Sequence, residues 1–102
     1  MKPVTVVNQL VIKPGKMDEF IDVQRNFATA LRQKPCGLIG GRMLRSIDGR
    51  SAVLLSQFES ESALENLRQS PGFKEHLVQL QVLVESANPS LYQEAYTTGD
   101  FQ

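Results

Sequence analysis

The sequence has few of the residues that build metal and redox sites. It contains one cysteine (Cys36), one histidine (His76) and no tryptophan. A single cysteine cannot form an intrachain disulfide, and one cysteine with one histidine is too small a set for a conventional zinc site. The "GLIGG" stretch precedes a predicted strand, whereas a dinucleotide fingerprint must open a helix. We therefore expect no metal and no resident redox cofactor.

An excess of charge of one sign is also absent. The 11 basic and 11 acidic residues give a net charge of zero, so the composition indicates neither a nucleic-acid partner nor a membrane surface. No stretch approaches the roughly 20 apolar residues of a transmembrane helix, and the first residues lack a cleavage-site pattern. We expect a soluble, cytoplasmic protein. Its 102 residues predict one domain over 1–102, with a core at about 4–97 and a loose tail at 98–102.

Periodicity predicts an α+β fold. Strands are expected where apolar residues alternate or flank Asp48-Gly49, and helices where they recur every three to four residues. The predicted order is strand 4–12, helix 17–33 (stopped by Pro35), strands 37–46 and 51–60, helices 60–69 and 71–85, and strand 91–98. This βαββ(α)αβ order is ferredoxin-like, with an antiparallel four-stranded sheet and helices on one face.

The second face of that sheet needs its own cover. Val7, Val11, Val53 and Leu55 fall on the positions that alternate with the helix-facing ones, so both faces of the central strands are apolar. One set of helices cannot cover both faces. We therefore expect a homodimer that packs sheet against sheet.

Polar residues interrupt two apolar rows. Asn8 stands in the middle of Val4, Val6, Leu10 and Ile12, which share one face of the first strand. His76 falls within the apolar arc of the last helix, and Asn66 borders the arc of the helix before it. Buried amides and imidazoles can simply be hydrogen-bonded core groups. Because they come from different elements, they are equally compatible with a shared polar cavity between helices and sheet.

Several longer motifs resemble one family. The first-strand asparagine, "KPGKMDEF", "KPCGLIGGRMLRSIDGRSAVLLSQFES" and "ESALENLRQSPGFKEH" are similar to the antibiotic biosynthesis monooxygenase (ABM) domain family, of the dimeric α+β barrel superfamily. The resemblance runs from about Val4 to Tyr96. It implies the dimeric barrel fold and a cavity between the helices and the sheet.

The resemblance implies two chemistries. One branch of the family oxidises phenols, quinols or anthrones with O2 and no cofactor, and it would make a small aromatic molecule the substrate. His76 is then the acid/base or oxyanion partner, Asn8 a hydrogen-bond donor, and the substrate contacts are Asn66, Phe20, Phe27, Phe58 and Phe73. A heme-degrading branch uses an Asn, a Trp and a His. Here Asn66 stands at the Trp position, so heme is the lesser alternative, and a non-catalytic dimeric binding module is a third.

Overall fold

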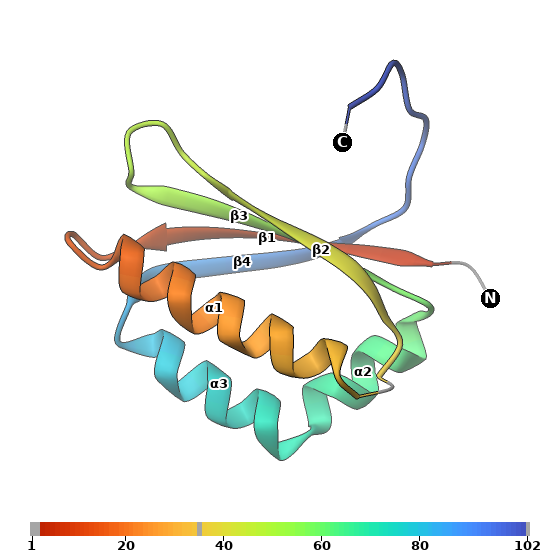
Figure 1. Ribbon diagram of the computed structural model, residues 1–102, viewed down its shortest axis with the longest axis horizontal. Helices are drawn as coiled ribbons and strands as arrows, with labels where there is room; N and C mark the ends of the chain where they lie inside the picture. Colours follow the sequence, from red (N-terminus) through yellow and green to blue (C-terminus); the bar gives the residue numbers. More distant parts are fainter. Residues whose placement is uncertain (1–2, 35, 102) are drawn as a thin grey trace.

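The protein is a four-stranded sheet with three helices packed on one of its faces (Figure 1). The computed structural model describes residues 3–34 and 36–101. The elements are β1 (Val4–Ile12), α1 (Met17–Arg32), β2 (Leu38–Arg45), β3 (Ser51–Phe58), α2 (Glu61–Gln69), α3 (Pro71–Gln81) and β4 (Val84–Tyr92). Pro35, which we expected to stop α1, lies outside the described residues.

The sheet is antiparallel, with the strand order β2-β3-β1-β4. β1 is central and pairs with β3 along Val4↔Phe58 to Val11↔Ser51, while β4 forms the edge on its other side. This topology confirms the predicted ferredoxin-like α+β fold with helices on one face (Figure 1).

The alternation of β1 decides which face meets the helices. Val4, Val6, Leu10 and Ile12 are all buried, whereas Val11 on the opposite face is 42% exposed. Side chains alternate along a strand, so Asn8 lies on the buried, helix-facing row. The structure thus places the interrupted row against the helices.

Local sequence signals explain where α2 and α3 begin. The Ser60 hydroxyl accepts from the backbone N–H of Ala63 at 3.1 Å, and the Ser70 hydroxyl accepts from that of Phe73 at 3.2 Å. Pro71 occupies the first turn of α3, where its missing N–H costs nothing. The two serines therefore cap two successive helices, and Ser70 marks the junction at which α2 ends and α3 begins.

The C-terminal part differs from the sequence-based prediction. We expected the last helix to reach residue 85 and the last strand to occupy 91–98. Instead α3 ends at Gln81 and β4 runs from Val84 to Tyr92. Asn88-Pro89 looked like a breaker, but Pro89 pairs opposite Asn8 on an edge strand, where a residue without an N–H is tolerated.

Two apolar clusters fill the space between helices and sheet. The first cluster holds the buried residues Leu10, Ile12, Phe20, Ala52, Leu80 and Leu83. The second cluster holds Val4, Val6, Phe58, Leu64 and Leu67. Each draws on β1 and β3 together with at least one helix, so the fold has a packed core at each end of the helix–sheet layer.

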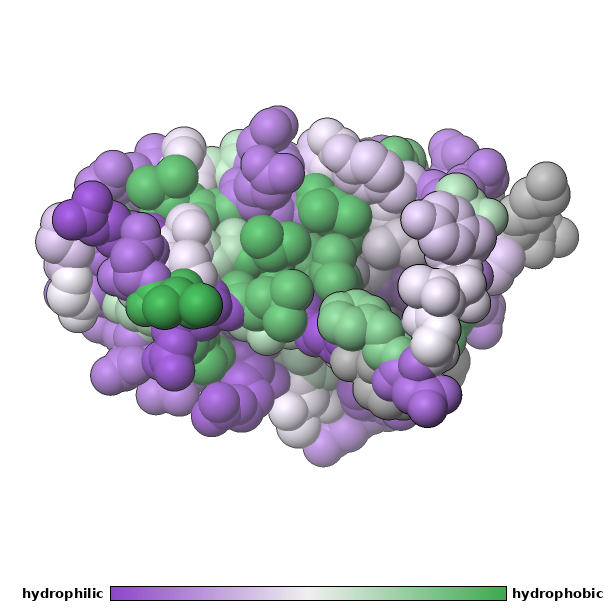
Figure 2. All heavy atoms as spheres, turned by 90° about the horizontal axis from the view of Figure 1, so that it is seen from above, coloured by the Kyte–Doolittle hydropathy of each residue, from purple (hydrophilic) through white to green (hydrophobic). Residues whose placement is uncertain are grey.

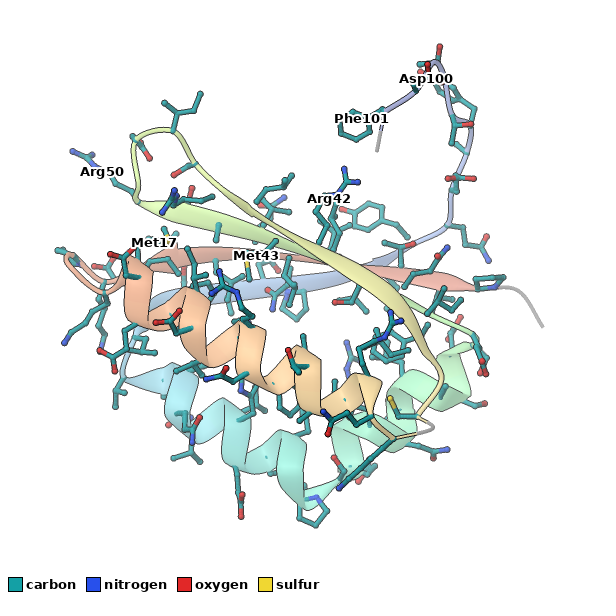
Figure 3. The ribbon with its side chains drawn as sticks, in the orientation of Figure 1. Met17, Arg42, Met43, Arg50, Asp100 and Phe101 are labelled. Atoms are coloured by element: carbon teal, nitrogen blue, oxygen red, sulfur yellow. The ribbon has the colours of Figure 1, made fainter. Side chains whose placement is uncertain are left out.

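The face of the sheet away from the helices is open in the single chain. Figure 2 views it from above and shows apolar side chains gathered at its centre, with polar ones around them. The β-register puts Val7, Leu55, Val53 and Leu44 on this face, and Leu44 is 44% exposed. The segment after β4 rises on the same side, where the Phe101 ring lies 5.3 Å from the Arg42 guanidinium (Figure 3).

Candidate functional site

A layer of polar side chains separates the two apolar clusters. On β1, Asn8 lies between Val6 of the second cluster and Leu10 of the first. On two helices, too, a buried polar residue lies between apolar residues of the clusters. On α1, Gln24 lies between Phe20 and Phe27, and on α3, His76 lies between Phe73 and Leu80. We call Asn8, Gln24 and His76 the polar layer.

His76 and Gln24 form the one direct contact within the polar layer. His76 Nε2 lies 2.8 Å from Gln24 Oε1, and the two residues are 6% and 8% exposed. The Phe27 ring stacks flat on the imidazole, with ring centroids 4.0 Å apart and planes 5° from parallel. The imidazole is therefore fixed by an amide at its edge and an aromatic ring on its face.

The surroundings of His76 keep it neutral. Burial lowers the pKa of His76 from 6.5 to about 4, because the charged form loses its hydration. Gln24 carries no charge that could oppose this effect. At pH 7 the ring is therefore an uncharged imidazole, with one protonated nitrogen and one lone pair.

Asn8 has a hydrogen-bond acceptor without a donor. Its Oδ1 is the one buried side-chain nitrogen or oxygen atom that lacks a partner in residues 3–34 and 36–101. Leaving such a group unpaired costs roughly 1–3 kcal/mol, and a ligand in the cleft would remove that cost only if the side chain turned its oxygen outward. The amide Nδ2 is not enclosed in this way, so the hydrogen-bond donor that we expected at Asn8 stays a prediction.

The polar layer lines a cleft between the helices and the sheet. The cleft has a volume of about 1580 Å³, and its walls include Asn8, Gln24, Phe27, Phe58, Phe73 and His76. On its outer side it is bordered by exposed residues of α1 such as Arg25 and Ala28, so it opens to solvent. Apolar, polar and charged side chains all line it. Its volume exceeds the roughly 300–1,000 Å³ of a typical small-molecule site, so a small aromatic ligand would fill only part of it. We call it the helix–sheet cleft.

Some of the site residues proposed from the sequence line the cleft, and others do not. Asn8 and His76 share the cleft with Phe27, Phe58 and Phe73. Phe20 does not line it, because its side chain is fully buried within the first apolar cluster. Asn66 is an exposed residue of α2 and does not line the cleft. Helical periodicity placed Asn66 at the margin of its apolar arc, and in the structure it falls on the solvent side.

Gln24 is the residue that sequence reasoning missed. It is the one polar residue within the apolar stripe of the helix predicted at 17–33, but a single polar residue in such a stripe often lies partly in solvent. The gap on α1, the gap on β1 and the histidine on α3 share a common feature. Each interrupts an apolar row at its midpoint, and that coincidence was the available signal.

The fold is that of a small α+β domain with a cleft between its helices and its sheet. The antibiotic biosynthesis monooxygenase family model matches residues 3–79, and the chain belongs to this family. SnoaB, a cofactor-independent oxygenase from Streptomyces nogalater, is 25% identical, with a TM-score of 0.85 over 98% of this chain and 100% of that one.

More distant structures share the fold. Rv0793 from Mycobacterium tuberculosis is 20% identical, with a TM-score of 0.80 over 96% of this chain and 100% of that chain. PA3566 from Pseudomonas aeruginosa is 14% identical, with a TM-score of 0.80 over 94% and 97% of the two chains. A comparison with curated protein sequences gives no match. None of the helices in the described residues is long and apolar enough to cross a membrane.

The cleft does not suit heme ligation by His76. The ring nitrogen Nε2, the usual iron ligand, is engaged by Gln24 at 2.8 Å, and Phe27 stacks on one face of the imidazole. Asn66, which stands where the heme-degrading branch carries its tryptophan, is exposed outside the cleft. Binding heme through His76 would require both the hydrogen bond and the stacking to be given up.

Proposed function

We propose that the protein is a cofactor-independent monooxygenase that oxidises a small phenolic, quinol or anthrone-like aromatic with O2. The observation that carries this proposal is the placement of the Asn8 side-chain amide and the neutral imidazole of His76 in one cleft with aromatic walls. The similarity to SnoaB, described as a cofactor-independent oxygenase, supports the same class of reaction.

The side-chain amide of Asn8 favours a ligand that brings a phenolic oxygen. Its Oδ1 is enclosed, so the group that Asn8 can offer to the cleft is the Nδ2–H donor. A phenol oxygen accepts such a hydrogen bond, and an ionised phenol accepts it more strongly. Asn8 should therefore stabilise the phenolate more than the neutral phenol.

His76 would take the phenolic proton. Burial holds the pKa of His76 near 4, so the ring is neutral and has a lone pair to offer. A phenolate formed beside the ring attracts the imidazolium and raises its pKa. The two charges therefore arise together and stabilise each other within a largely apolar cleft.

Ionisation of the substrate removes the need for a cofactor. An ionised phenol or anthrone gives up electrons to O2 far more readily than its neutral form. For an anthrone, two C–H bonds break and one C=O bond forms; one oxygen atom enters the product and the other leaves as water. The substrate supplies all four electrons that reduce O2, so no further reductant is required.

We propose a homodimer as the working unit. The helix-free face carries Val7, Val53, Leu55 and Leu44 at its centre, and a monomer would leave this apolar surface in water (Figure 2). A second copy offers the same surface, so a two-fold, sheet-to-sheet contact would bury both at once. It would leave the helix–sheet cleft of each subunit on the outside of that contact.

Oxygen uptake with a panel of hydroquinones and anthrones tests the function. We expect protein-dependent uptake with at least one member, unchanged after dialysis against a metal chelator, and one atom of 18O from 18O2 in the product. The rate without protein is subtracted, because hydroquinones oxidise spontaneously. No protein-dependent uptake with any member would contradict the proposal and favour a non-catalytic binding module.

A further inference from the structure

The hydrogen bond between α1 and α3 carries a further assignment. Gln24 occupies a position in the apolar stripe of α1 where a hydrophobic residue is expected, yet it is only 8% exposed. A buried amide loses its hydrogen bonds to water, and this costs free energy unless a protein group replaces them. Its partner is His76, which lies 52 residues further along the chain.

The chemistry of this contact fixes the tautomer of the ring. An amide oxygen can only accept a hydrogen bond, so the nitrogen that faces Gln24 Oε1 at 2.8 Å must carry the proton. That nitrogen is Nε2. In the neutral ring the lone pair is then on Nδ1, which becomes its single basic atom.

Nδ1 remains within reach of a ligand. Asn8 Oδ1 is the one fully buried, unpartnered side-chain polar atom in the described part of the chain, so Nδ1 is not enclosed in that way. His76 lines the helix–sheet cleft and also a groove of about 340 Å³ between α1 and α3. The exposed part of the ring therefore faces one or both of these cavities, through which a substrate or solvent could reach Nδ1.

Phe27 and Gln24 restrain different motions of the ring. Stacking at 4.0 Å holds the imidazole plane, but it is compatible with both ring orientations that a 180° rotation about the Cβ–Cγ bond relates. The hydrogen bond from Nε2 opposes that turn, because the alternative orientation would leave Gln24 Oε1 without a donor. Together the two contacts leave one orientation and one tautomer.

We propose that Gln24 is a positioning residue for His76: its side-chain oxygen keeps one ring proton on Nε2, so that Nδ1 is the atom that accepts the substrate proton. The proposal rests on the proposed function for its catalytic consequence. In the step, the phenolic O–H bond breaks, an Nδ1–H bond forms, and the oxygen keeps the electron pair. Gln24 Oε1 continues to accept from Nε2–H and so supports the imidazolium until the proton leaves.

Gln24 is the polar group closest to the ring, but charged groups share the surrounding cavities. Those that line the helix–sheet cleft are Asp18, Asp22, Arg25 and Arg32 on α1, Arg42 and Arg45 on β2, and Arg68 on α2. Glu75 of α3 lines the outer groove. β1, β3 and β4 contribute uncharged residues to the cleft. Asp18 pairs with Arg45 and Asp22 with Arg25, both at exposed positions.

The ring itself gives the test, because His76 is the one histidine of the sequence and its 15N signals need no assignment. At pH 7 we expect a protonated Nε2 and an unprotonated Nδ1. In Gln24→Met the two signals should move toward each other as the tautomers exchange, and in Gln24→Glu the neighbouring carboxylate should raise the pKa of His76. Gln81→Met and Gln81→Glu, at an exposed position of α3, are the matched controls and should change neither.

A ring protonated on Nδ1 in the wild-type protein would overturn the proposal, and so would unchanged nitrogen signals in Gln24→Met. The wild-type spectrum needs no variant and decides the tautomer even if both Gln24 variants fail to fold. With an active substrate, Gln24→Met should lower kcat roughly 10- to 100-fold, with KM changed less than about threefold. In Gln24→Glu the acid limb of the pH profile should move to higher pH. Absent turnover in the wild type would contradict the proposed function, whereas the ring spectrum would still decide the role of Gln24.

Discussion

The two apolar clusters and the polar layer between them are built from the same elements but with opposite chemistry. In the first cluster β1 and α1 bring together Leu10 and Phe20, which are 1% and 0% exposed. Two residues along the strand lies Asn8, and four residues along the helix lies Gln24. The contrast shows that the helix–sheet layer is closely packed at its ends and interrupted by polar side chains at its middle, where we propose that the substrate binds.

The largest expected effect breaks the closed end. Phe20→Ala should lower the free energy of unfolding by about 3–5 kcal/mol, because it empties a fully enclosed position in the first cluster. Chemical denaturation at pH 7 measures the loss. The turnover of the molecules that remain folded should stay close to the wild-type value. Loss of turnover in fully folded Phe20→Ala would mean that the closed end and the site are not separate.

A second substitution tests the opposite face of the sheet. Val7→Lys should shift the protein from dimer to monomer at micromolar concentration, since it would bury an unpaired charge at a cost of several kcal/mol. Sedimentation velocity distinguishes the 11.4 kDa chain from its dimer. Ile47→Lys, at the exposed hairpin tip, is the control and should remain dimeric. A wild-type protein that sediments as a monomer would refute the proposed dimer directly.

The smallest effect concerns acid and the polar layer. The pKa of His76 is near 4 in the folded protein and about 6.5 when unfolded, so the unfolded chain binds the proton more readily between these values. Stability that is fully present above pH 6.5 should therefore fall as the pH approaches 4, by roughly 1–3 kcal/mol. His76→Gln should lack this part of the acid loss. Identical pH dependence of unfolding in the two proteins would show that His76 is not buried in its neutral form.

Much of this arrangement could be predicted from the sequence. The hydrophobic periods gave α1, the hairpin and β1. They put Asn8 in an apolar row of β1 and His76 in the apolar arc of α3, but they left open whether the Asn8 row faces the helices or a partner subunit. Family resemblance extended this to a cavity between helices and sheet. The prediction succeeded where one period persisted over a whole element and a clear turn signal, such as Asp48-Gly49, ended it.

The remaining features depend on tertiary contacts. β4 was misplaced because Pro89 is unfavourable in a strand by local rules, and only its edge position opposite Asn8 makes it acceptable. Phe20 and Phe27 are both inward-facing aromatics of α1, and their different roles follow from what each one meets across the layer. The role of Gln24 depends on a partner 52 residues away, which no local pattern could reveal.

We propose that the polar layer binds the substrate and takes its proton, and is not only a polar part of the core. The most direct test of this proposal is the rate of oxygen uptake, with the best substrate of the panel, in Asn8→Ala and His76→Ala, with Asn66→Ala as the exposed control. We expect a 10- to 1,000-fold lower turnover in both Asn8→Ala and His76→Ala, with the dimer intact. Asn66→Ala should keep the wild-type turnover. Wild-type rates in both Asn8→Ala and His76→Ala would contradict the account and leave these side chains as core polar groups.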